Sequence, residues 1–114
     1  MWEKTIKIND FNLVYEYQKP MKFVRLDFNG NKITEHPLEL QRFVILLQAY
    51  ISNRLPKEMY AVVKNTLVYR ERISDQEFLA VKVNQYKKML NKVDAMEIYA
   101  VLEKFISRID IFEA

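Results

Sequence analysis

One histidine with neighbouring carboxylates is the group in this chain best suited to proton transfer near neutral pH. His36 has Glu35 and Glu39 beside it, and an imidazole titrates close to neutrality. A histidine base also needs a nucleophile and an oxyanion donor, and the sequence offers neither in a recognisable motif. A single histidine without clustered ligands does not define a metal site. We therefore interpret His36 as an exposed residue before a helix that begins with Pro37.

The scarcity of glycine and the absence of cysteine exclude several kinds of chemistry. Gly30 is the only glycine, whereas phosphate-binding loops and nucleophile elbows need several. Without cysteine there is no disulfide, no thiolate nucleophile and no cysteine-containing zinc site. The acids Glu71, Asp75 and Glu77 fit a helix connection and its cap better than a glycosidase pair. We predict a protein that is not an enzyme and has no catalytic residue, cofactor or metal.

The whole chain has a formal net charge of +3, and its basic residues concentrate in the middle. Such a segment, from Arg54 to Lys92, could neutralise the phosphates of a nucleic acid or bind an acidic partner. On the wheel of a helix that starts near Leu79, however, the lysines surround the polar side and form no stripe, which favours a solvated face. The candidate contacts are Lys64, Arg70, Arg72, Lys82, Lys87, Lys88 and Lys92.

Two hydrophobic periods divide the chain at Pro37. Before it, apolar residues alternate with polar ones, which predicts three or four antiparallel strands over about residues 3–34. Asn29 and Gly30 form the strongest hairpin signal. After Pro37 the period becomes helical, and the first helix has a wide apolar stripe around Phe43.

The remaining helical segments are less uniform. A second helix is expected from Pro56, although residues 66–73 also fit a strand. Ser74 and Glu77 have the spacing of a capping box for a third helix, and Asp94 begins a fourth. We therefore predict one α+β domain over residues 1–114, with an N-terminal antiparallel meander of three to four strands. About four helices, over residues 37–113, pack on one face of the sheet.

An aromatic stripe on the second predicted strand has two interpretations. Phe11, Tyr15 and Tyr17 lie on one side of that strand, and single-strand nucleic-acid binders use such stripes to stack bases. The predicted helices also need a sheet face to cover, which places the stripe in the core.

The apolar content exceeds what the predicted core can bury, and this indicates an interface. We predict a small cytoplasmic interaction module, a regulator, inhibitor or adaptor that contacts a protein partner or a second copy of itself. The alternative is a nucleic-acid-binding protein that uses the basic segment. No membrane contact is expected, because the longest apolar run, Phe43 to Leu47, is far too short to span a bilayer. The candidate interface residues, which fall off the predicted core faces, are Trp2, Val14, Val68, Val81 and Ile111.

Overall fold

The computed structural model describes the chain at residues 2–8, 11–18, 21–28, 31–34, 37–63 and 65–113. A first antiparallel sheet has the order β1-β2-β3-β4, and a second has the order β5-β6-β7-β8. The first sheet consists of β1 (Trp2–Ile8), β2 (Phe11–Gln18), β3 (Met21–Phe28) and β4 (Asn31–Thr34). The second consists of β5 (Tyr60–Val63), β6 (Thr66–Ile73), β7 (Gln76–Val83) and β8 (Tyr86–Leu90).

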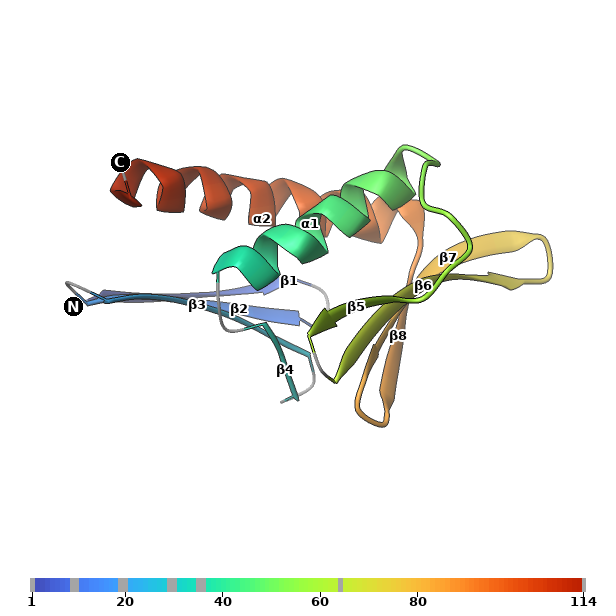
Figure 1. The fold of residues 1–114 in the computed structure, drawn as a ribbon, viewed down its shortest axis with the longest axis horizontal. Helices are drawn as coiled ribbons and strands as arrows, with labels where there is room; N and C mark the ends of the chain where they lie inside the picture. The colour runs from blue at the N-terminus through green and yellow to red at the C-terminus, as the bar shows by residue number, and fades with distance from the viewer. Residues whose placement is uncertain are drawn as a thin grey trace.

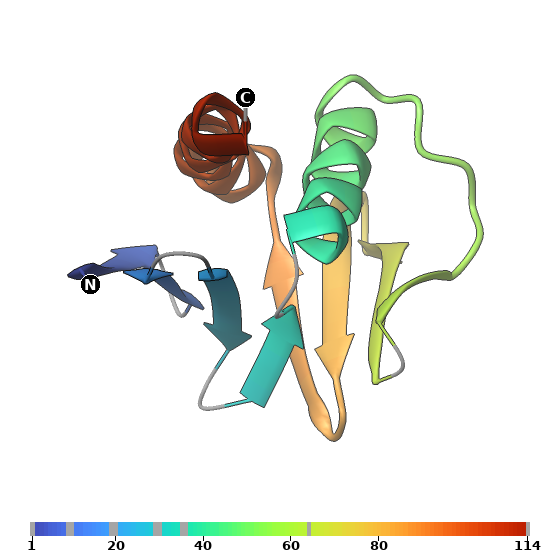
Figure 2. The same cartoon turned by 60° about the vertical axis from the view of Figure 1, so that its left-hand side comes forward.

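One helix follows each sheet, so the same order of elements occurs twice along the chain. Helix α1 (Pro37–Ile51) follows β4, and α2 (Lys92–Glu113) follows β8. The two helices contact one another and lie on the same side of the sheets (Figures 1 and 2). Within the described residues neither helix has the length and hydropathy that crossing a membrane requires.

The prediction of about four helices is wrong, although the α+β class holds. The described residues form two helices, and the segments expected to be the second and third helices are the strands β5 to β8. Leu79 and Val83, four residues apart, share a face in a helix, but they also share a face in a strand. In the structure they lie on one side of β7, and Leu79 pairs directly with Leu90 of β8.

The strands before Pro37 lie where the alternating pattern predicted them. Asn29, Gly30 and His36, to which the sequence assigned a turn and a helix start, lie outside the described residues. The same holds for the side chains of the aromatic stripe on β2.

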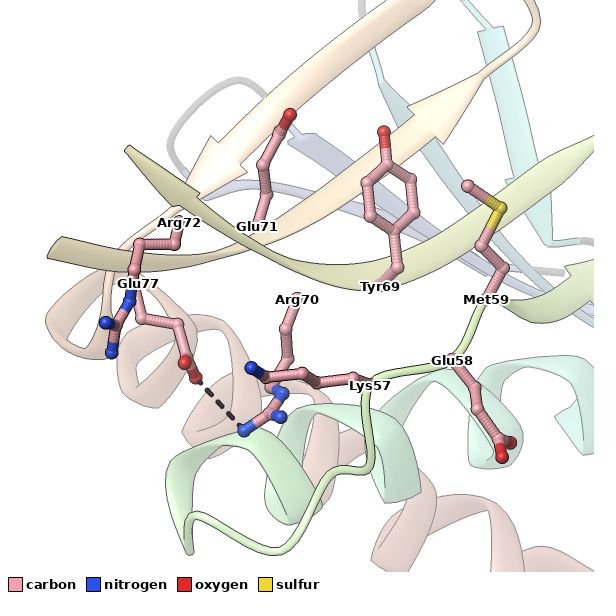
Figure 3. A pocket seen from close by; sticks show the side chains of 8 residues that line it. All are labelled: Lys57, Glu58, Met59, Tyr69, Arg70, Glu71, Arg72 and Glu77. Carbon is pink, nitrogen blue, oxygen red and sulfur yellow. Dashed lines mark ion pairs between the residues drawn. The ribbon is translucent and has the colours of Figure 1, made fainter. Parts of the chain in front are cut away.

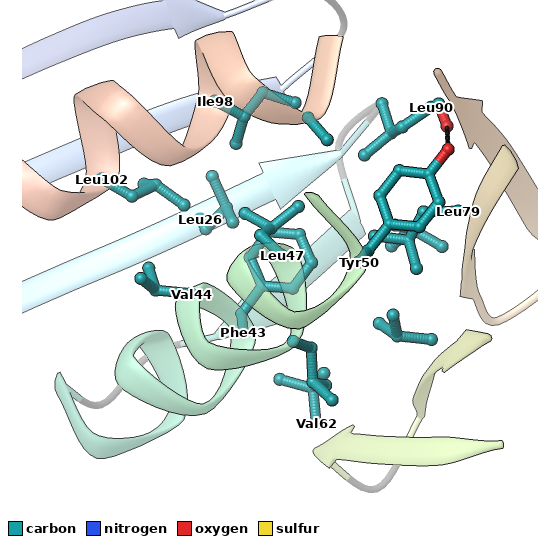
Figure 4. Close-up of a cluster of buried hydrophobic side chains, with 14 of the residues drawn as sticks. Leu26, Phe43, Val44, Leu47, Tyr50, Val62, Leu79, Leu90, Ile98 and Leu102 are labelled. Atoms are coloured by element: carbon teal, nitrogen blue, oxygen red, sulfur yellow. Dashed lines mark hydrogen bonds between the residues drawn. The ribbon is translucent and has the colours of Figure 1, made fainter. Parts of the chain in front are cut away.

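Helix α1 is the centre of the core, as its apolar stripe predicted. Leu40, Phe43, Leu47 and Tyr50 are all fully buried. They belong to one cluster with Leu26 of β3, with apolar residues of β5 to β8 and with Ala95, Ile98 and Leu102 of α2 (Figure 4). The helices and both sheets therefore share a single apolar core.

The Ser74 pattern that suggested a helix cap is the turn of the β6–β7 hairpin. Ile73 pairs with Gln76 around a two-residue loop, and Ser74 has a φ of 57°. Positive φ at the first loop residue is typical of the tight turns that match the twist of the flanking strands. A side chain with a Cβ is unfavourable in this left-handed region.

Replacing Ser74 with glycine should therefore stabilise the protein. Removing the Cβ relieves about 1–2 kcal/mol, and the greater freedom of glycine in the unfolded chain returns about 0.5–1 kcal/mol. We expect Ser74→Gly to raise the free energy of unfolding by about 0.5–1 kcal/mol in urea titrations. Asp75→Gly, in the same turn but without a positive φ, is the control. An equal gain in both variants would contradict the conformational explanation.

Candidate functional site

The second sheet has an incompletely paired strand. β5 pairs with β6 only from Thr66 to Val68, and Tyr60 at the start of β5 lies opposite Val68. β6 continues to Ile73, so residues 69–73 have β7 on one side and none of the described strands on the other. This free stretch of β6, residues 69–73, is named here the open edge.

The hairpin geometry determines which backbone groups the open edge presents. The residues that flank a two-residue loop, here Ile73 and Gln76, form a hydrogen-bonded pair, and such pairs alternate with non-bonded pairs along an antiparallel ladder. Tyr69 and Glu71 therefore direct their N–H and C=O groups toward β7. Arg70 and Arg72 direct theirs away from β7, toward the side without a strand.

A pocket of about 410 Å³ lies along this open edge (Figure 3). It is named here the β6 pocket, and the segment that joins α1 to β5 forms its other wall. Six of the eight lining residues are charged, in contrast to the mainly apolar lining of small-molecule sites. The lining residues are Lys57, Glu58, Met59, Tyr69, Arg70, Glu71, Arg72 and Glu77.

The side chains of the β6 pocket divide between the two sides of the sheet because successive residues of a strand point in opposite directions. Arg70 and Arg72 point to the helix-facing side, and Glu77 of β7 lies opposite Arg72. Tyr69 and Glu71 point to the outer side, as Figure 3 shows, and Met59 extends to that side as well. The pocket thus extends around the edge of β6 and has a cationic side and an aromatic side.

Two of the three acids that line this pocket, Glu71 and Glu77, are paired, whereas Glu58 is exposed and forms no ion pair with a described residue. Arg70 forms an ion pair with Glu77 at 3.5 Å. Lys87 donates hydrogen bonds to both carboxylate oxygens of Glu71, at 3.0 and 3.1 Å. The hydrogen bond with Glu71 raises the pKa of Lys87. Both ion pairs are partly exposed, so each adds little to stability.

Among the described residues, two cations of the β6 pocket and one acid, Glu58, have no ion-pair partner. Arg72 and Lys57 are exposed and form no ion pair with any residue in the described part of the chain. The Nε atom of Arg70 has no acceptor among the described residues, but it is buried and so not open to a bound molecule. The capacity to bind carboxylates therefore lies with Arg72 and Lys57, and arginine binds carboxylates well through its planar set of donors.

Exposed apolar groups lie at both ends of the β6 pocket. Met59 is 67% exposed in its lining, and Ile73 is 54% exposed at the end of the open edge. Tyr69 is half-buried between them. These groups can contact apolar side chains of a bound molecule on the outer side of the sheet.

The basic residues predicted from the sequence are not brought together on one surface. Arg70 and Arg72 lie on the helix-facing side of the sheet, whereas Lys82 and Lys87 lie opposite one another on the outer side. Lys88, on the helix-facing side, is half-buried, and Lys64 lies outside the described residues.

Lys92, another predicted contact, is bound to the end of α1. Its Nζ donates to the carbonyl oxygen of Tyr50 and, at 2.7 Å, to Oδ1 of Asn53. It also lies 4.1 Å from the centre of the Tyr50 ring. Asn53 has a φ of 58°, the left-handed conformation that ends many helices. Lys92 thus holds the helix terminus.

Tyr50 connects α1 to the second sheet through its hydroxyl group. The hydroxyl lies 3.0 Å from the carbonyl oxygen of Glu77 and 3.3 Å from that of Leu90, in positions to donate to either. Figure 4 shows the contact with Leu90. Burial, together with the negative charge of Glu77, raises the pKa of this phenol above 10.0.

The raised pKa of Tyr50 predicts a loss of stability in alkali. Well below pH 10.0 the Tyr50 phenol is protonated in both the folded and the unfolded chain. Above pH 10.0 the phenol ionises in the unfolded chain before it ionises in the folded protein. The free energy of unfolding therefore falls with rising pH until the pH passes the raised pKa of the folded protein. At pH 8, Tyr50→Phe should lower the free energy of unfolding by about 1 kcal/mol. Urea titrations from pH 8 to 11.5 should show this deficit shrinking above pH 10, and a constant deficit would contradict it.

Two of the predicted interface residues are core residues. Val68 and Val81 are fully buried and pair with one another across β6 and β7. They appeared to lie off the core face because a helical period was assumed for strands. The side chains of Trp2, Val14 and Ile111 lie outside the described part of the chain.

Sequence reasoning missed the open edge and the β6 pocket, apart from Arg70 and Arg72. The available signal was the alternative interpretation of residues 66–73 as a strand.

No cluster of three or more histidine, cysteine, aspartate or glutamate residues that could hold a metal ion occurs among the described residues. Comparisons with known proteins found no matching family model, no matching curated protein and no matching solved structure.

Proposed function

We propose that this protein acts by binding an extended segment of a partner protein, which is added as a strand to the open edge of β6. The observation that carries the proposal is the coincidence of this edge with the β6 pocket. In strand addition, backbone hydrogen bonds supply affinity, and the neighbouring pockets select alternate side chains. The N–H and C=O groups of Arg70 and Arg72, which have no backbone partner among the described residues, supply the hydrogen bonds, and the lining residues supply the selectivity.

The distribution of charge supports protein binding over the nucleic-acid alternative. A nucleic-acid site needs cations on one surface that track the phosphates. Here Lys87 and Arg70 are paired with acids, and Lys92 is bound to the end of α1. The remaining cations lie on two opposite sides of one sheet.

The test is a pair of substitutions at one edge residue. A displayed library of random peptides is selected on the wild-type protein, and the selected peptides are then measured against Arg72→Ala and Arg72→Pro. Proline removes the outward N–H of residue 72 and leaves the ladder with β7 intact, because that N–H does not bond to β7. Alanine removes only the side chain.

We expect Arg72→Pro to lower peptide affinity at least tenfold relative to Arg72→Ala. Equal affinity in the two variants would show that the backbone of the edge is not used, and the proposal would fail. If Arg72→Pro does not fold, the proposal is tested by amide hydrogen exchange of the wild-type protein with and without a selected peptide. A bound peptide should protect the amides of Arg70 and Arg72 far more than those of Tyr69 and Glu71, which already bond to β7.

A further inference from the structure

We infer that the segment bound at the open edge has acidic side chains at alternate positions, with apolar side chains between them. This inference rests on the proposed strand addition and specifies the partner by its chemistry. It follows from the different character of the two sides of β6.

The acidic positions follow from the helix-facing side. Residues directly opposite one another on paired strands have their side chains on the same face. Partner residues opposite Arg70 and Arg72 therefore point to the helix-facing side, on which Figure 3 also places Lys57. Within the described chain Arg72 and Lys57 form no ion pair, and the one lining acid that is also unpaired is Glu58. A carboxylate opposite Arg72 can bind Arg72 and Lys57. A second one, opposite Arg70, can accept from the guanidinium N–H groups that Glu77 does not occupy.

The apolar positions follow from the outer side. Partner residues between and beside the two acids point to the side of Tyr69, whose ring is half-buried. Met59 and Ile73, both more than half exposed, lie at the ends of that surface. Glu71 lies on the same side, but its charge is already balanced by Lys87. Branched apolar residues in the partner would cover this surface and favour the extended conformation.

The open edge of a second copy of this chain does not meet these requirements. In a two-fold antiparallel pairing of open edges, the outward residues of one copy face those of the other. In every such pairing in which Arg70 and Arg72 both bond to the other copy, an arginine of one copy lies directly opposite an arginine of the other. Like charges at directly opposed positions are destabilising. The same charges protect the edge from pairing with itself, so the acidic segment is not the open edge of a second copy.

The experiment measures defined peptides by fluorescence anisotropy at low and high salt. The probe is a labelled nine-residue peptide in which glutamate alternates with valine. Three controls keep the length: glutamine in place of glutamate, lysine in place of glutamate, and a permuted peptide of the same composition with its glutamates adjacent. The proteins are the wild type, Arg72→Ala, Arg72→Pro and Arg72→Glu. A labelled oligodeoxythymidine tests the nucleic-acid alternative.

We expect the alternating glutamate peptide to bind the wild type at least tenfold more tightly than each control, and more weakly as salt increases. Arg72→Glu should weaken this peptide and strengthen the lysine peptide. If the glutamine or lysine peptide binds the wild type equally well while Arg72→Pro still abolishes binding, the acidic preference is wrong and strand addition stands. If Arg72→Pro and Arg72→Ala bind alike, or no peptide binds and the oligonucleotide does, both are wrong.

Discussion

Phe43→Ala should lower the free energy of unfolding by about 3–5 kcal/mol. Phe43 is fully buried in α1, in the core shared by both helices and both sheets. Its removal eliminates buried apolar area and leaves a cavity that a close-packed interior cannot fill completely. Because small proteins are stable by about 5–15 kcal/mol, the loss is a large fraction of the total. Urea or thermal unfolding, followed by circular dichroism, measures it.

Ile45→Ala is the matched control on the same helix. Ile45 is 63% exposed, so its truncation removes little buried area and leaves no cavity. Alanine also has the higher helix propensity. We expect a change within about 0.5 kcal/mol. If the two variants lost similar stability, the orientation of α1 in the structure would be incorrect.

Lys92→Met should lower the free energy of unfolding by about 1.5–3 kcal/mol, the usual range for hydrogen bonds to charged groups. The substitution keeps the length and packing of the side chain. It removes the ammonium donor from the Tyr50 carbonyl and from Asn53 Oδ1, together with the contact with the Tyr50 ring. Burial lowers the pKa of Lys92, so some of the gain from these bonds offsets the cost of desolvating the charge. The lower end of the range is therefore expected.

A double-mutant cycle with Asn53→Ala tests the mechanism. The loss in the double variant should be smaller than the sum of the single losses by at least about 0.5 kcal/mol, because both substitutions remove the same hydrogen bond. Lys82→Met, at an exposed lysine of β7, should change stability by less than about 0.5 kcal/mol. Additive losses at positions 53 and 92, or an equal loss at Lys82, would show that Lys92 does not hold the end of α1.

The distinction between a structural and an available cation could not be made from the sequence. Lys92 and Arg72 are equivalent there, as two basic residues within one basic segment. The structure separates them, because Lys92 lies against the carbonyl groups that end α1, whereas Arg72 lies at the open edge and has no ionic partner among the described residues. Elements distant in sequence create this difference. Only Arg72 therefore enters the proposed binding surface.

The sequence by itself determined the strands before Pro37 and the central position of α1. The two-residue alternation and the wide apolar stripe are local patterns, and each fits one kind of element. The pattern from Ser74 to Leu90 is ambiguous, since residues four apart share a face in both a helix and a strand. The tertiary structure decided that case by pairing Leu79 with Leu90 beneath the helices. It also created the candidate site, because the open edge of β6 arises from the unequal lengths of β5 and β6. Such a difference becomes visible only when the two strands are paired.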